Sequence, residues 1–182
     1  MSWNIGSTAP SLTPAGESQN DFLPKHPAAL SEEEVWQKYV QKRADRYLEA
    51  FRKIREGQTA PNIAIFFIGP FWLAYRKLYF EAFCWFVIVL GVDFVLPLFI
   101  DSPSAIDSIS KGIASLVNGL LMIYANNLYL NKIKKLDVMG AILRQGDPER
   151  WEIYARKKGG TSVLAVFLTI FFLFAALLFL PA

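Results

Sequence analysis

Histidine and cysteine are almost absent from this 182-residue sequence, which holds one of each. With Cys84 alone, the chain has no internal disulfide framework and no multi-cysteine zinc or iron–sulfur site. His26 lies outside the apolar half of the sequence, which rules out a histidine-ligated haem or chlorophyll there. The sequence therefore predicts neither a cofactor nor a metal site.

Charged residues are also scarce, at 19% of the chain, against about 25% in an average soluble domain. The net charge of +3 is too small to indicate nucleic acid as a partner. The sequence contains no nucleophile elbow, no P-loop and no metal-binding pair on a helix. A convergent set of histidine, cysteine or paired carboxylates is missing as well. These absences favour a protein that is not an enzyme.

Apolar residues make up 53% of the chain and aromatic residues 15%. Three apolar stretches are long enough, at about 1.5 Å per residue, to cross a hydrocarbon layer of about 30 Å. They lie at residues 78–100, 113–130 and 162–180. We therefore predict an all-α membrane protein with three transmembrane helices. Residues 78–182 would form the transmembrane domain, with a cytoplasmic loop at 131–160.

Lysine and arginine are distributed very unevenly about these stretches. Eighteen of the nineteen lie in residues 1–77 and 131–160, and only Lys111 lies in the loop 101–112. Cytoplasmic loops carry an excess of lysine and arginine. The distribution therefore predicts a multi-pass protein with a cytoplasmic N-terminus and a periplasmic C-terminus.

Three segments precede the predicted spans, and the first two are a polar tail and a helix. Residues 1–29 are rich in proline and lack an apolar period, which predicts a disordered polar tail. Residues 30–57 predict an amphipathic cytoplasmic helix, because Ser31 and Glu34 have the spacing of a capping box and an apolar stripe follows. This helix would pack on the rest of the protein, lie on the anionic leaflet, or bind a partner protein.

Residues 61–77 combine an aromatic run with a break and two cations. Gly69 ends the apolar run, and Pro70 suits the first turn of a new helix. Aromatic rings beside cations are typical of the headgroup level of a membrane. We therefore predict an aromatic-basic interfacial segment at the cytoplasmic side. Its predicted membrane-interface residues are Trp72, Tyr75, Arg76 and Lys77.

The predicted span 113–130 is small and polar on one side and aliphatic on the other. In lipid, helix interfaces depend on small residues and hydrogen bonds rather than on hydrophobic burial. The polar side is therefore expected to face other helices, and the aliphatic side is expected to face lipid. The predicted helix-packing residues are Ser115, Asn118, Gly119, Met122, Asn126 and Tyr129.

Two carboxyl groups lie within the first apolar stretch. Glu81 follows Lys77 by four residues, which predicts an ion pair near the interface. Asp93 lies deeper, about level with Asn118 in the second span. Ionisable groups inside a membrane are rare and are often functional. Asp93 would lock the first two spans together, serve as a proton or ion site, or contact a polar group of a partner.

The run from Asn62 to Lys77 resembles a family of small bacterial inner-membrane proteins, a domain of unknown function with YigF-like members. The resemblance lies in an asparagine, an aromatic-rich run, a Gly-Pro, a Trp and a final Tyr-Arg-Lys. Weaker similarities extend it over about residues 38–165. The resemblance implies a topology without an activity. It also implies that the four predicted interface residues act together.

Three helices of this length enclose little volume for a substrate path. We therefore expect a non-catalytic accessory or scaffolding subunit of a larger bacterial inner-membrane complex, respiratory or photosynthetic for example. It would contact membrane lipids and other integral membrane subunits. The alternative is an oligomeric protein that transports a proton or small solute past Asp93. A membrane enzyme is the third and least favoured class.

Overall fold

The computed structural model describes residues 30–179, with side chains to residue 175, and from residue 31 onward they belong to one compact unit. The predicted polar tail at residues 1–29 lies outside the described residues. Within the described range the chain is helical and forms no strand, which confirms the all-α fold class. The elements are α1 (Glu32–Val40), α2 (Ala44–Arg55), α3 (Ile63–Tyr75), α4 (Tyr79–Val95), the 3-10 turn η2 (Leu96–Leu98), α5 (Pro103–Gly146), α6 (Pro148–Lys158) and α7 (Val163–Phe179).

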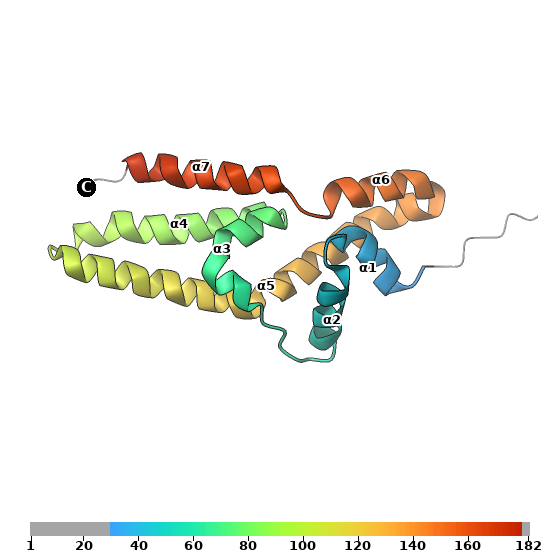
Figure 1. The fold of residues 1–182 in the computed structure, drawn as a ribbon, viewed down its shortest axis with the longest axis horizontal. Coiled ribbons are helices and arrows are strands. Elements are labelled where there is room, and N and C mark those ends of the chain that lie inside the picture. Colours follow the sequence, from blue (N-terminus) through green and yellow to red (C-terminus); the bar gives the residue numbers. More distant parts are fainter. Residues whose placement is uncertain (1–29, 180–182) are drawn as a thin grey trace, which may run out of the picture. The chain divides into compact units, whose positions relative to one another are not determined.

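Three helical segments are long and apolar enough to cross a membrane, as the sequence predicts. Figure 1 shows α4, the first half of α5 and α7 running alongside one another. Only 11% of the apolar window in Tyr79–Leu98 is buried inside the protein. Helices that are apolar on all sides and exposed are typical of membrane spans. Their largest exposed side chains include Phe80, Phe83, Phe94, Leu116, Leu120, Phe167 and Phe171.

The second predicted span is part of a much longer helix, since α5 has 44 residues. The predicted loop 101–112 is therefore mostly helix, and so is the first half of the predicted loop 131–160. The helix continues because its apolar side does: Ile133 is fully buried, and Leu136 and Leu143 pack against the same core. After Gly146 the chain turns, and α6 packs back on α5.

Asp147 caps the start of α6, because its side chain accepts a hydrogen bond from the backbone of Arg150 at 3.0 Å. Tyr39 of α1 then ties this hairpin together. Its hydroxyl accepts a bond from Trp151 Nε1 at 3.0 Å and donates one to the Leu136 carbonyl at 3.1 Å. Burial raises the pKa of the Tyr39 phenol, which keeps the hydroxyl a donor.

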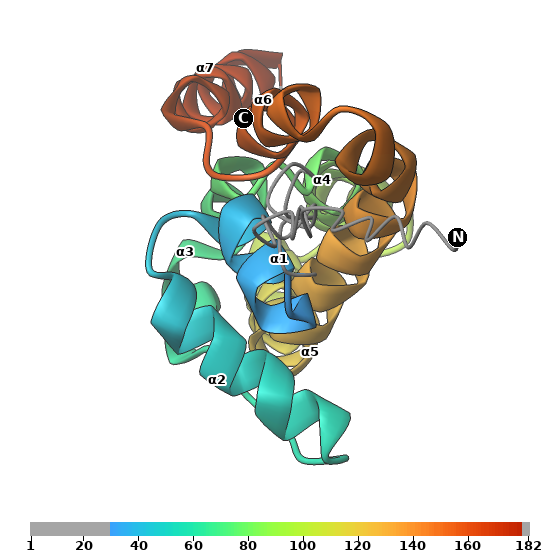
Figure 2. The same cartoon turned by 90° about the vertical axis from the view of Figure 1, so that its right-hand side faces the viewer.

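The single helix predicted over residues 30–57 is wrong, because the structure contains two helices there. The capping box at Ser31 is confirmed, but α1 ends at Val40. Gln41 and Arg43 follow with φ angles of +58° and +59°. The break lets α1 pack on α5 and α6 while α2 turns onto another part of α5 (Figure 2). A straight helix cannot bury both apolar stripes.

The predicted break at Gly69 is confirmed: its φ and ψ of +22° and −105° divide α3 into two short helices. The bent segment packs against α4, α5 and α7 (Figure 1). Its side chains Ile65 and Leu73 are fully buried. The segment predicted as aromatic-basic and interfacial therefore packs among three other helices.

Candidate functional site

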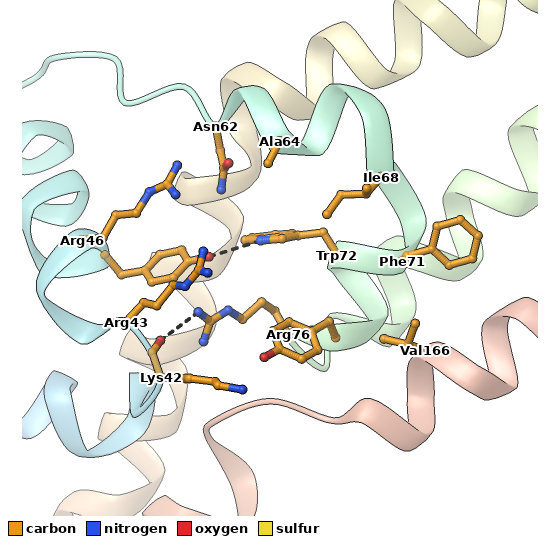
Figure 3. Close-up of a pocket in the computed structure, with 12 residues that line it drawn as sticks. Lys42, Arg43, Arg46, Asn62, Ala64, Ile68, Phe71, Trp72, Arg76 and Val166 are labelled. Carbon is orange, nitrogen blue, oxygen red and sulfur yellow. Dashed lines mark hydrogen bonds between the residues drawn. The ribbon is translucent and has the colours of Figure 1, made fainter.

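Arg76 follows the last residue of α3 and points into the interior, where only 1% of it is exposed. Its guanidinium donates three hydrogen bonds. Nη1 bonds the Val40 carbonyl at 3.2 Å and the Tyr129 hydroxyl at 3.1 Å. Nη2 bonds the Lys42 carbonyl at 3.0 Å (Figure 3). The last carbonyls of a helix have no partner within it. Arg76 therefore caps the end of α1 and holds the turn that follows.

Aromatic rings surround the same guanidinium. Its central carbon lies 4.2 Å from the ring centre of Tyr47 and 5.0 Å from that of Tyr129. Trp72 belongs to the same group, because its Nε1 donates a hydrogen bond to the Tyr47 hydroxyl at 3.2 Å. We call these four residues, Arg76, Tyr47, Trp72 and Tyr129, the Arg76 cluster. Cation–π contacts strengthen when the groups are desolvated, so the cluster joins α2, α3 and α5.

The Arg76 cluster contains no carboxylate. Within the described part of the chain, no aspartate or glutamate oxygen lies within 4.0 Å of this guanidinium. Carbonyl dipoles and ring faces solvate the charge but do not neutralise it. The cluster is therefore a source of positive potential at the end of the apolar helices.

Two lysines cap neighbouring helix ends in the same way. Lys77 Nζ donates to the carbonyls of Lys157 at 2.9 Å and Gly159 at 2.6 Å, where α6 ends. Lys132 Nζ donates to the carbonyls of Arg76 at 2.6 Å and Lys77 at 3.2 Å, just after α3. Cations are favoured at helix C-termini. Burial lowers the pKa of Lys77, and the nearby charge of Lys158 lowers it further.

The predicted interface residues occupy different surroundings from those expected. Trp72 and Arg76 are buried, with 6% and 1% exposed, and therefore do not form a headgroup belt. Tyr75 and Lys77 are half-buried. For Trp72 and Arg76, fixed acceptors and ring faces inside the protein take the place of headgroups and water, whereas an interfacial role of Tyr75 and Lys77 stays a prediction. Of the other two members of the Arg76 cluster, Tyr129 is predicted only as a helix-packing residue, and the sequence predicts no separate role for Tyr47.

Most of the predicted helix-packing residues on α5 contact other residues of this chain. Trp85 Nε1 donates to Asn118 Oδ1 at 2.9 Å, and Asn126 Nδ2 donates to the Ala60 carbonyl at 2.8 Å. The carbonyl of Met122 accepts a bond from the backbone of Asn62 at 2.8 Å. Tyr129 belongs to the Arg76 cluster. Ser115 is exposed, and a methyl group on Gly119 would meet nothing within 4 Å.

The predicted ion pair of Glu81 does not form among the described residues, and Asp93 makes no side-chain hydrogen bond that would lock the first two spans together. Asn118 is bound by Trp85, so that pair, and not Asp93, forms the side-chain hydrogen bond between the first two spans. Asp93 is half-buried and has no hydrogen bond or ion pair to any described side chain. Lys77 does not pair with Glu81, because its φ of +59° places it between α3 and α4 rather than on the same helix.

The chemistry of this region is that of anion binding. Its functional groups are cations and aromatic rings, with donors directed at oxygen atoms. In the range that the structure describes, no three histidine, cysteine, aspartate or glutamate side chains gather to hold a metal ion. The Arg76 cluster with its capping lysines is therefore the candidate site.

The matches to known proteins are few. A family model described as "Protein of unknown function (DUF2628)" matches residues 32–135, which run from α1 into α5. The matched range contains the whole Arg76 cluster and leaves out α6 and α7. No curated protein and no solved structure matches the chain. Because the model covers more than half of the sequence, the chain belongs to the DUF2628 family of proteins of unknown function.

Proposed function

We propose that this protein is a non-catalytic accessory or scaffolding subunit of a larger complex in a bacterial inner membrane. The observation that carries the proposal is the Arg76 cluster, which fixes the end of α1 and the basic helix α2 to α3 and to the long helix α5. A scaffold must present one surface at a constant position relative to the membrane. Hydrogen bonds from one buried side chain to two helices provide that rigidity.

The distribution of charge supports an orientation. The helices α1, α2 and α6 and the second half of α5 carry most of the cations and gather at the same end of the apolar helices (Figure 1). Lys111 is near the opposite turn. Under the positive-inside rule this charge distribution favours a cytoplasmic basic end, so the proposal includes a cytoplasmic N-terminus and a periplasmic C-terminus.

Ser115 and Gly119 are the part of the α5 stripe that remains open, and small residues let another helix approach closely. A partner's transmembrane helix would therefore dock there. Native extraction of the full chain with its lipids should co-isolate a membrane subunit at fixed stoichiometry. Gly119→Leu should reduce this subunit about tenfold or more, because overpacking an interface costs about 1–3 kcal/mol.

The matched control is Leu120→Phe, on the exposed aliphatic side of α5, which should retain the subunit. Recovery of the chain only as a lone species in lipid would contradict the proposed function. If Gly119→Leu and Leu120→Phe retain the membrane subunit equally, the partner does not dock at Ser115 and Gly119.

Transport is the second candidate function, favoured by the half-buried Asp93, which no described side chain pairs. If an oligomer moves protons past this group, Asp93→Asn should abolish proton flux in proteoliposomes, because the amide cannot release a proton. Glu81→Gln is the control and should keep the flux. Flux of the unaltered protein equal to that of empty vesicles would reject this candidate and leave the scaffold.

A further inference from the structure

We propose that a cavity beside the Arg76 cluster binds the phosphate of an anionic phospholipid. The cavity has a volume of about 350 Å³, within the range of about 300–1,000 Å³ that small-ligand pockets occupy. Figure 3 shows it between the turn that joins α1 to α2 and the bent helix α3, with the start of α7 at its far side.

Every charged side chain that lines the cavity is a cation. They are Lys42, Arg43, Arg46 and Arg76. None of the four lies within 4.0 Å of a carboxylate in the part of the chain that the structure describes. Cations that converge on one cavity without a counter-ion attract an anion.

The remaining cations of α2 behave differently. Farther along the same helix, Arg52 pairs with Glu33 at 3.2 Å, and Arg55 pairs with Glu32 at 2.8 Å. Lys53 pairs with Glu49 within the helix at 2.7 Å. Carboxylates therefore pair with the cations farther along α2, whereas Asp45, in the first turn beside the cavity, does not line it and pairs with none of its cations. The unpaired cations are a local feature and do not reflect the composition of the helix.

Two buried polar side chains at the cavity have atoms without a partner. Arg76 Nε has no acceptor, and Asn62 Oδ1 has no donor, although only 4% of Asn62 is exposed. Both side chains reach the cavity (Figure 3). A buried polar atom left unpaired is costly, and native proteins contain few of them. A phosphate supplies acceptors, and a headgroup hydroxyl, as in phosphatidylglycerol, supplies a donor.

The turn at the cavity rim is strained. Gln41 and Arg43 both have positive φ angles, which side chains other than glycine rarely adopt. Strained residues persist where the surroundings fix them, and they gather at ligand sites. Here Arg76 holds the Lys42 carbonyl between them. Lys42 and Arg43 of this turn, and Arg46 just after it, line the cavity.

The opposite wall of the cavity is apolar, which distinguishes a lipid from free phosphate. Ile68 and Phe71 come from α3, and Val166 comes from the first turns of α7, one of the apolar helices (Figure 3). Soluble phosphate gains nothing from such a wall. The glycerol and first acyl carbons of a phospholipid bury apolar surface there. The ligand is therefore a phosphate that carries apolar chains.

This proposal is tested on the full chain, purified in detergent to which equal amounts of phosphatidylglycerol and phosphatidylcholine are added. Native mass spectrometry then measures which lipid stays bound to the protein. The unaltered protein should retain phosphatidylglycerol. The pair Lys42→Gln with Arg46→Gln should reduce that retention about 10- to 30-fold, as expected for two lost phosphate contacts. The control pair, Lys134→Gln with Lys135→Gln, removes the same charge from exposed residues outside the cavity and should keep the lipid.

Two further arms complete the experiment. Ala64→Phe fills the cavity from its exposed lining residue without a change in charge, and it should cause the same loss. Inorganic phosphate or glycerol phosphate, added as competitor, should not displace the lipid. Equal loss in the cavity pair and the control pair would overturn the proposal, as would full retention by Ala64→Phe. Displacement by inorganic phosphate would show a site for free phosphate and overturn the assignment to lipid.

Discussion

Replacement of Arg76 by methionine is expected to lower the free energy of unfolding of the α1–α2 region by about 3–5 kcal/mol. Methionine fills a similar length but donates nothing. The carbonyls of Val40 and Lys42 and the hydroxyl of Tyr129 would each lose a partner. Each buried acceptor left unpaired costs about 1–3 kcal/mol, and the contacts with the rings of Tyr47 and Tyr129 are lost as well.

Arg76→Lys separates the contribution of the positive charge from that of the guanidinium's shape. An ammonium keeps the positive charge, but it lacks the planar fork that reaches two carbonyls and a hydroxyl together. We therefore expect it to restore less than half of the lost stability. Lys134→Met is the matched control, because this exposed lysine lies on α5 outside the cluster and most such changes stay within about 0.5 kcal/mol.

Trypsin cleavage after Lys42 and Arg43 provides the measurement, since both residues lie in the turn that Arg76 holds. Cleavage follows the population of the opened form when opening is fast. A loss of about 3 kcal/mol therefore corresponds to cleavage about 100-fold faster in Arg76→Met. Cleavage rates equal to those of Lys134→Met would show that the cluster does not hold the turn.

Local signals predict most of the helix boundaries in this chain. Ser31 and Asp147 are caps, and Gly69 followed by Pro70 is a break; each acts through residues within one turn of itself. The length of the three apolar stretches likewise predicts the three long helices. Such features depend on neighbours in the sequence, and therefore the sequence is enough to find them.

The turn between α1 and α2 has no such signal. Gln41 and Arg43 occupy conformations that favour glycine or asparagine, and no glycine or proline marks the position. The turn forms because contacts distant in the sequence hold it. Gln41 Nε2 donates to the carbonyl of Arg156 at 3.2 Å, and the backbone of Gly160 donates to the Tyr39 carbonyl at 2.7 Å. The local sequence pattern alone predicts that the helix continues through Gln41 and Arg43, which it does not.

The burial of Arg76 is also set by distant residues. A Trp and a Tyr beside two cations fit a headgroup belt and a buried cluster equally well, because both solvate a cation with rings and oxygen atoms. The buried cluster forms because Tyr47 and Tyr129, which belong to other helices, contact the Arg76 guanidinium. Periodicity shows which side of each helix is apolar, but it does not show which helices meet.

Gly69→Ala is expected to destabilise the protein by about 2–4 kcal/mol. Two effects add. The φ of +22° with ψ of −105° lies outside the regions that residues with a side chain occupy, at a cost of about 1–3 kcal/mol. A methyl group there would also lie 2.7 Å from Asn118 Oδ1, so that Asn118 must move away from its bond with Trp85.

A double-mutant cycle separates the two effects. In an Asn118→Ala background the methyl group meets no amide, so Gly69→Ala should cost only the backbone strain. The double variant should therefore be destabilised by about 1 kcal/mol less than the sum of the two single variants. Gly91→Ala on α4 is the control, because a methyl group there meets nothing within 4 Å and alanine suits a helix interior better than glycine. Thermal unfolding in detergent measures all four variants. Equal melting temperatures for Gly69→Ala and Gly91→Ala would mean that α3 can straighten, and the bend that brings Arg76 beneath α1 would then not depend on this glycine.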